Sequence, residues 1–169
     1  MRLTALACLA LVAACTETSE GPDLVGLWRV TSHTENNTGC TPGAVVTDPP
    51  YIQFTRETLF GQEYYQWAPC SAPGTCETTS LFDLSYAKAI PGGYEAQIYV
   101  ASGDAIACSL GATVSTAILA DDGTLTIETR VNTKDSITGT ACTTDEAKAA
   151  LDAGQLTCGS LEVMTAARN

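Results

Sequence analysis

The sequence predicts an all-β protein, an eight-stranded up-and-down antiparallel barrel with one short helix before the last strand. Three observations lead to this expectation. Apolar and polar residues alternate along eight segments, turn residues separate several of these segments, and six cysteines fall in or beside the connections at one predicted end. Alternation with a period of two residues is typical of strands that bury one face. A β-sandwich is the alternative architecture.

The eight predicted strands differ in length but share this alternation. Asp121-Asp122-Gly123 and Pro91-Gly92-Gly93 lie between pairs of them and predict tight turns. In up-and-down order these turns fall at one end, and the long connections 34–45, 68–77 and 134–158 fall at the other. The predicted strands are residues 24–32, 51–56, 58–67, 80–87, 93–101, 105–120, 124–131 and 161–165.

One short helix is predicted before the last of these strands. Thr143 is followed three residues later by Glu146, which is the spacing of a capping box. Residues 145–153 are rich in good helix formers, and Gly154 suits the position after a helix end. At about ten residues, such a helix depends on packing against the rest of the domain.

The chain has eight cysteines, two of them within the first fifteen residues. An even number in the rest of an exported chain indicates three disulfide bonds. Six cysteines allow fifteen pairings, and Cys142–Cys158 is the first choice because it would clamp both ends of the predicted helix. No C-x-x-C pair occurs and His33 is the only histidine, so the sequence predicts no metal and no cofactor. The disulfide candidates are Cys40, Cys70, Cys76, Cys108, Cys142 and Cys158.

The first fifteen residues predict export. Arg2 precedes an uncharged apolar run that is too short to span a membrane, which needs about 20 residues. Val12-Ala13-Ala14-Cys15 resembles the lipobox of bacterial lipoprotein precursors. This resemblance implies cleavage before Cys15 and attachment of acyl chains, such as palmitate, to that cysteine. The predicted division is a signal peptide over residues 1–14, a lipidated polar tether over 15–23, and a folded domain over 24–169.

The resemblance also implies a location in the bacterial cell envelope. Thr16, directly after the anchor, resembles the residue found in lipoproteins that are sent to the outer membrane. The expected place is therefore the outer membrane, at its periplasmic face or at the cell surface. The alternative is an ordinary signal peptide cleaved near Ala14, which would leave Cys15 as a plain thiol.

The charge of the chain excludes some partners. Nineteen acidic residues face eight basic ones, and the net charge is −11. Nucleic acids and anionic lipid headgroups would repel a surface of this sign. We therefore expect no nucleic-acid partner, and we expect the membrane to be reached through the lipid anchor.

Gly26-Leu27-Trp28, near the start of the first predicted strand, resembles the G-x-W signature of lipocalins. The resemblance implies an eight-stranded barrel that holds a small apolar ligand inside. Arg130 is the candidate for the arginine that this family carries late in the chain. The family's T-D-Y turn signature is absent, and the predicted helix precedes the last strand, whereas lipocalins usually place theirs after the barrel.

Five aromatic residues are expected to point into the barrel. Barrels of eight strands either fill with side chains or hold one small ligand, and the alternation leaves both possibilities open. The cavity candidates are Trp28, Phe54, Phe82, Tyr86 and Tyr94.

No catalytic set is visible in the sequence. Nucleophilic catalysis through histidine would depend on His33, no G-x-S-x-G elbow occurs, and His33 is expected to be exposed where the first strand passes into a loop. Asp121 and Asp122 lack the spacing of a calcium-binding EF-hand loop. The sequence therefore predicts a non-enzymatic lipoprotein that binds a small apolar ligand. The alternative is a structural or protein-interaction module with disulfide-pinned loops.

Overall fold

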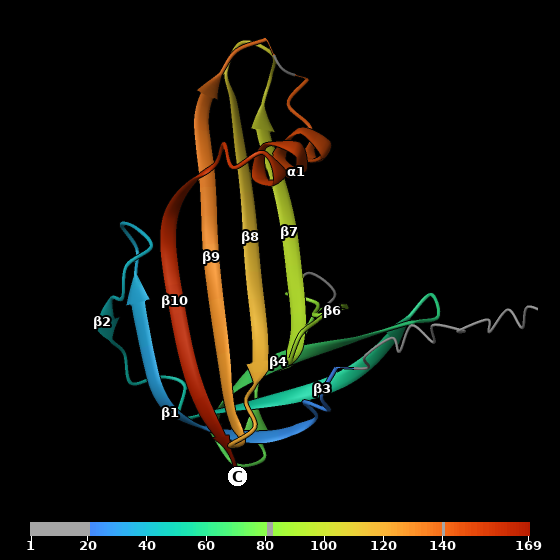
Figure 1. Cartoon of the computed structure of the whole chain (residues 1–169), viewed down its shortest axis with the longest axis vertical. Coiled ribbons are helices and arrows are strands. Elements are labelled where there is room, and N and C mark those ends of the chain that lie inside the picture. Colours follow the sequence, from blue (N-terminus) through green and yellow to red (C-terminus); the bar gives the residue numbers. More distant parts are fainter. Residues whose placement is uncertain (1–20, 81–82, 140) are drawn as a thin grey trace, which may run out of the picture.

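The structure is a computed structural model that describes residues 21–80, 83–139 and 141–169. These residues form ten strands and one short helix (Figure 1). The helix is α1 (Thr144–Asp152). The strands are β1 (Gly26–Asn36), β2 (Ala44–Val45), β3 (Tyr51–Leu59), β4 (Gln62–Ala72), β5 (Thr75–Cys76), β6 (Lys88–Ile90), β7 (Gly93–Gly103), β8 (Cys108–Leu119), β9 (Thr124–Ile137) and β10 (Thr157–Arg168).

The strands form one antiparallel sheet, so the predicted all-β, antiparallel class is confirmed. Their order is β5-β4-β3-β1-β10-β9-β8-β7-β6, with β2 paired to β1 beside this path. The path has two ends, β5 and β6, so the sheet is open and the predicted closed barrel of eight strands is not confirmed. One bridge, between Tyr65 of β4 and Tyr86 just before β6, links the two end regions.

The approach to β6 explains why the ends of the sheet meet at a single bridge. The sequence predicts a strand over residues 80–87, yet the described part of this segment pairs with β4 only at Tyr86. The Gln66 side-chain amide donates to the carbonyl oxygen of Ser80 at 2.8 Å, and the Asp83 N–H donates to the same oxygen at 3.1 Å. The Ser80 carbonyl oxygen thus accepts from a turn N–H and from a side chain. These hydrogen bonds take the place of the backbone hydrogen bonds that a paired strand would form.

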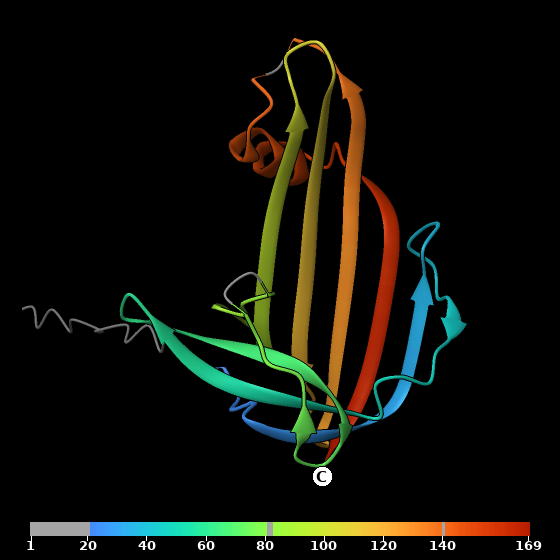
Figure 2. The same ribbon diagram turned by 180° about the vertical axis from the view of Figure 1, so that it is seen from behind.

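Two groups of strands face each other across the core. Figures 1 and 2 show β7, β8 and β9 side by side along the long axis, whereas β3 and β4 run across their lower part. Burying apolar side chains between the two groups supplies the main driving force for this arrangement. The cluster consists of Leu24, Trp28, Ile52, Phe54, Tyr65, Tyr86, Ala96, Ala117, Leu125, Ile127, Met164 and Ala166.

Helix α1 begins directly after Thr143, and the predicted role of Thr143 as N-cap is confirmed. Thr143 Oγ1 accepts a hydrogen bond from the Glu146 N–H at 3.3 Å, and the Glu146 carboxylate accepts from the backbone N–H groups of residues 141 and 142. The helix ends before Gly154, whose φ of 66° is the left-handed conformation that glycine adopts easily. Ala147 and Ala150 are buried and join Cys108 and Leu110 of β8 in a second, smaller core cluster.

Three disulfide bonds join the six predicted cysteines. They are Cys40–Cys158, Cys70–Cys76 and Cys108–Cys142, so the first-choice pair Cys142–Cys158 is wrong. The reason is strand pairing: β10 lies beside β1, which brings Cys158 to the loop after β1, while α1 packs on β7 and β8 and brings Cys142 to the start of β8. Disulfide bonds persist in oxidising compartments, so these three indicate an extracytoplasmic environment.

The disulfides do not gather at one rim of the fold. Cys70 pairs across β3 and β4 with Tyr51, which in turn pairs with Arg29 near the start of β1. Cys40 instead follows the end of β1. The β4–β5 hairpin lies at the same end of the long axis as the C-terminus, whereas α1 lies toward the opposite end (Figure 2).

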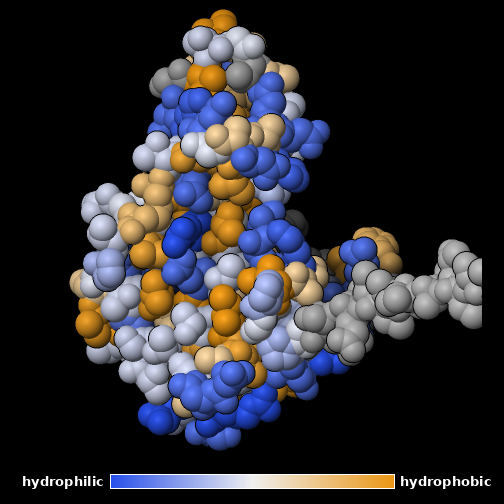
Figure 3. All heavy atoms as spheres, in the orientation of Figure 1, coloured by the Kyte–Doolittle hydropathy of each residue, from blue (hydrophilic) through white to orange (hydrophobic). Residues whose placement is uncertain are grey.

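The outer face of β8, β9 and β10 mixes apolar and polar side chains (Figure 3). Strand alternation leaves every second residue on this side of the sheet, including the partly exposed Ile118 of β8. In residues 21–80, 83–139 and 141–169, no helix has the length and apolar character that a membrane crossing requires. The predicted signal peptide, Cys15, most of the tether and Phe82 lie outside the described residues.

Candidate functional site

A groove of about 630 Å³ opens beside β4. One wall is the far half of β1, another is the Asp48-Pro49-Pro50 segment, and the third is the β4–β5 hairpin with its disulfide. Grooves and cavities larger than about 300 Å³ are typical of sites for small molecules. The apolar side chains that line the groove are Pro49, Pro50, Trp67 and Pro69.

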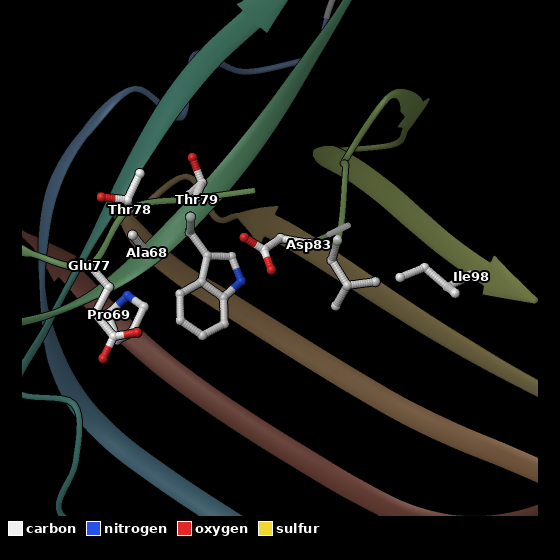
Figure 4. Close-up of a pocket in the computed structure, with 9 residues that line it drawn as sticks. Ala68, Pro69, Glu77, Thr78, Thr79, Asp83 and Ile98 are labelled. Carbon is white, nitrogen blue, oxygen red and sulfur yellow. The ribbon is translucent and has the colours of Figure 1, made fainter. Parts of the chain in front are cut away.

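A second hollow of about 420 Å³ continues from the first. The two share Trp67, Pro69 and Glu77 in their linings. Figure 4 shows Pro69 and Glu77 at one end of this second hollow and Ile98 of β7 at the other. Because the two hollows share these residues, they form one continuous groove, and Trp67 lines both parts of it. We refer to it as the Trp67 groove.

The orientation of Trp67 is fixed from behind by a chain of hydroxyl groups. Its indole N–H donates to the Tyr86 hydroxyl at 3.2 Å, which contacts Ser115 Oγ at 2.7 Å, and this in turn contacts Thr129 Oγ1 at 2.7 Å. Burial raises the pKa of Tyr86 to about 12, so the hydroxyl stays neutral at physiological pH. The polar edge of the indole is therefore satisfied inside the protein, and the partly exposed ring remains available to a ligand.

The groove is acidic. Four carboxylates and one histidine line its larger part, and among the described residues no lysine or arginine lines either hollow. Carboxylates that share a low-dielectric surface disfavour anions and favour cations. The ionisable groups of the larger hollow are His33, Glu35, Asp48, Glu77 and Glu162.

His33 lies inside this groove, and the expectation that it is exposed at a strand end is wrong. Only 5% of it is exposed. Strand β1 continues past it to residue 36 because β10 pairs along this whole stretch, and the segment around Asp48 folds over it. Its Nδ1 lies 2.5 Å from the Asp48 carbonyl oxygen, and its Nε2 lies 2.8 Å from Glu162 Oε1 and 3.7 Å from Glu35 Oε1.

The predicted cavity residues fill the core. Trp28, Phe54 and Tyr86 are completely buried, and Tyr94 packs against their cluster. None of these four lines either hollow of the Trp67 groove. Their size explains this outcome, because large aromatic side chains occupy the space between the two groups of strands.

Arg168, rather than Arg130, contacts Trp28. The Arg168 guanidinium lies 4.8 Å from the centre of the Trp28 ring, and the Trp28 indole N–H donates to the Leu24 carbonyl oxygen at 2.9 Å. Arg130 instead pairs with Glu128 at 2.6 Å on the sheet surface. The tryptophan of the G-x-W tripeptide is therefore closed off from solvent by the end of β10.

Trp67 is the residue that the sequence did not single out. Aromatic side chains stand at positions 64, 65 and 67 of the same strand, so alternation assigns Trp67 to the face of Tyr65 but gives no sign that a groove lies beside it. The carboxylates are equally hard to place, since they come from four separate segments. Comparison of this chain with described protein families, with curated proteins and with solved structures finds no match.

Proposed function

We propose that this chain is a lipid-anchored lipoprotein of the bacterial cell envelope that binds a small amphipathic ligand in the Trp67 groove. The single observation that carries the proposal is a partly exposed aromatic ring, held by the hydrogen bond from its indole N–H, in a hollow that three prolines and four carboxylates also line. A wall that is already ordered costs little entropy when a ligand binds.

The composition of the groove selects the ligand's chemistry. Its apolar part would pack on Trp67, Pro49 and Pro69, and a polar or positively charged end would face Glu77 and Glu162. Fatty acids and other anions would meet the same carboxylates and be repelled. We therefore expect a neutral or cationic amphipathic molecule.

A complete barrel belongs to this proposal. Its eight strands would follow the meander order that the lipocalin resemblance implies. They would be β1, β3, β4, the segment that contains Tyr86, and β7 to β10. The Tyr65–Tyr86 bridge supports this closure, because its two hydrogen bonds of 3.1 and 2.8 Å join β4 to the segment with which it would have to pair in a closed barrel. Closure would also protect the unpaired edges of β4 and β6.

Ligand binding is tested with the purified protein and a panel of neutral, cationic and anionic amphipaths, by native mass spectrometry and by tryptophan fluorescence. Trp67→Leu is expected to weaken binding of the best ligand more than tenfold. Phe60→Leu is the matched control, since Phe60 is 97% exposed at the β3–β4 turn and lies outside the Trp67 groove. Failure of the unaltered protein to retain any member of the panel would argue against the proposal.

The lipid anchor is tested by metabolic labelling with a palmitate analogue in a bacterial host. Cys15→Ser is expected to abolish labelling and to release the protein from the membrane fraction. Cys8→Ser is the matched control, because that cysteine lies within the segment that would be removed. Equal labelling of both variants would contradict acylation at Cys15.

A protein-interaction module is the second candidate function. The β3–β4 turn carries Phe60, which is 97% exposed, beside Leu59, which is 41% exposed, and the hairpin projects from the rest of the fold (Figure 1). Exposed apolar side chains of this kind suit contact with a partner protein. A photo-crosslinking amino acid at position 60 would test it, with position 57 of β3 as the control.

A further inference from the structure

We propose that His33, Glu35 and Glu162, which line the Trp67 groove, bind one divalent transition-metal ion, with Zn²⁺ as the best fit. One donor atom from each of the three residues lies within 4.8 Å of the others. The inference does not depend on the proposed amphipathic ligand, because it concerns side chains that can bind an ion alone.

The sheet itself brings the three donors together. His33 and Glu35 are two residues apart on β1, so their side chains leave the same face of the sheet. Glu162 lies directly opposite Glu35 in the register of β1 and β10. Two paired strands therefore hold all three donors, and rigid elements hold a metal site more accurately than loops do.

The two carboxylates need a positive charge between them. Like charges directly opposite each other on neighbouring strands destabilise the pair. Among the described residues, no lysine or arginine forms an ion pair with Glu35 or Glu162. Asp48 and Glu77 line the same hollow and add to the negative potential, so the site favours a cation.

The hydrogen bond behind His33 orients its ring for metal binding. A backbone carbonyl oxygen can only accept, so Nδ1 must donate its proton to the Asp48 carbonyl oxygen at 2.5 Å. When Nε2 carries no proton, its lone pair faces the two carboxylates, so a metal ion bound there would replace the hydrogen bond of 2.8 Å between His33 Nε2 and Glu162 Oε1. Metal-binding histidines commonly donate their other N–H to a carbonyl or carboxylate in this way.

The donor set and the spacing suit zinc. One imidazole nitrogen and two carboxylate oxygens are ordinary zinc ligands, and ligands at about 2.1 Å from a tetrahedral ion lie about 3.4 Å apart. The distances from His33 Nε2 to Glu162 Oε1 and Glu35 Oε1, 2.8 and 3.7 Å, bracket this value. Three protein ligands leave a fourth position for water or for a group of a bound ligand.

The test is a calorimetric titration of the chelator-treated, disulfide-bonded protein with ZnCl₂, with MgCl₂ as the control cation. We expect one Zn²⁺ per chain and no comparable binding of Mg²⁺. Glu35→Gln and Glu162→Gln keep the side-chain shape and are each expected to weaken Zn²⁺ binding at least about tenfold. Glu57→Gln is the matched control: it removes the same charge from an exposed position on β3 and should bind like the unaltered protein.

Three outcomes would overturn the proposal. The first is the absence of saturable binding of one equivalent of Zn²⁺ by the unaltered protein. The second is equal Zn²⁺ affinity in Glu162→Gln, Glu35→Gln and Glu57→Gln. The third is Mg²⁺ binding as tight as that of Zn²⁺. Mg²⁺ prefers oxygen ligands, so equal affinity would indicate that the His33 nitrogen is not a ligand. Near-ultraviolet circular dichroism of each variant establishes that its fold is retained.

Discussion

Tyr65 and Tyr86 bridge the two ends of the sheet through a pair of backbone hydrogen bonds of 3.1 and 2.8 Å. The side chain of Tyr86 is completely buried beside Phe54, with ring centres 5.9 Å apart, and its hydroxyl accepts the indole N–H of Trp67. One residue thus connects the edge of β4, the core and the Trp67 groove. Substitution of Tyr86 should therefore change both the free energy of unfolding and the position of Trp67 in the groove.

Alkaline pH should destabilise the fold through Tyr86. Burial raises its pKa to about 12, against about 10 in an unfolded chain. Between these pH values the unfolded chain has released a proton that the folded chain retains, so the free energy of unfolding falls as pH rises, by at most about 1.4 kcal/mol per pH unit from this residue. Below pH 10 the contribution is fully present. Urea denaturation from pH 8 to 12 measures the slope.

The pKa of Tyr94 is also raised to about 12, mainly by burial, so Tyr94 contributes with the same sign. Tyr86→Phe should therefore remove part of the alkaline slope, and the double variant with Tyr94→Phe should remove more. At pH 7 the loss of the Tyr86 hydroxyl should lower the free energy of unfolding by about 1–3 kcal/mol, because the Trp67 N–H and the buried Ser115 hydroxyl lose their partner. An unchanged slope in the double variant would contradict this assignment.

The three disulfides should contribute unequally to stability. In the chain-entropy model, a cross-link constrains the unfolded chain more when it closes a longer loop. Cys40–Cys158 spans 118 residues and Cys70–Cys76 spans 6. Replacing each pair by alanines should cost about 5 kcal/mol for the first and about 2 kcal/mol for the second. Thermal or urea unfolding of the two double variants measures the difference, and the reverse order would contradict the assigned pairing.

Local features of this fold could be predicted from the sequence. The alternation over 124–131 lies within β9, the Asp121-Asp122-Gly123 turn joins β8 to β9 with Gly123 at a φ of 83°, and Thr143 is the N-cap of α1. Each depends on residues close together in the chain, where backbone preference and a few hydrogen bonds settle the conformation.

Features that depend on which strands become neighbours could not be predicted. Cys158 meets Cys40 only because β10 pairs with β1, and Glu162 meets Glu35 for the same reason. His33 becomes buried only when the segment around Asp48 folds across it. Short-range patterns do not contain these contacts, so the Trp67 groove and its carboxylates emerge only in three dimensions.

The cap of α1 offers a local test of stability. Thr143→Ala removes the oxygen that accepts from the Glu146 N–H at 3.3 Å and should lower the free energy of unfolding by about 1 kcal/mol. Thr143→Ser keeps a hydroxyl and should retain most of that stability. Hydrogen exchange of the α1 amides would localise the effect, and equal exchange in both variants would argue against the cap.

Arg168 should stabilise the fold by closing the core over Trp28. Its guanidinium stacks 4.8 Å from the ring centre and donates to the Asp23 carbonyl oxygen at 3.0 Å, which ties the start of the domain to its last strand. Because Arg168 is exposed, the stacking and the hydrogen bond together should be worth about 1–2 kcal/mol.

Arg168→Met keeps an apolar stem but loses both contacts, whereas Arg29→Met removes an exposed arginine from the adjacent strand β1 and serves as the control. The free energy of unfolding in urea and the near-ultraviolet circular dichroism of Trp28 should change in the first variant only. If both variants lose the same stability, net charge rather than the Trp28 contact accounts for the effect.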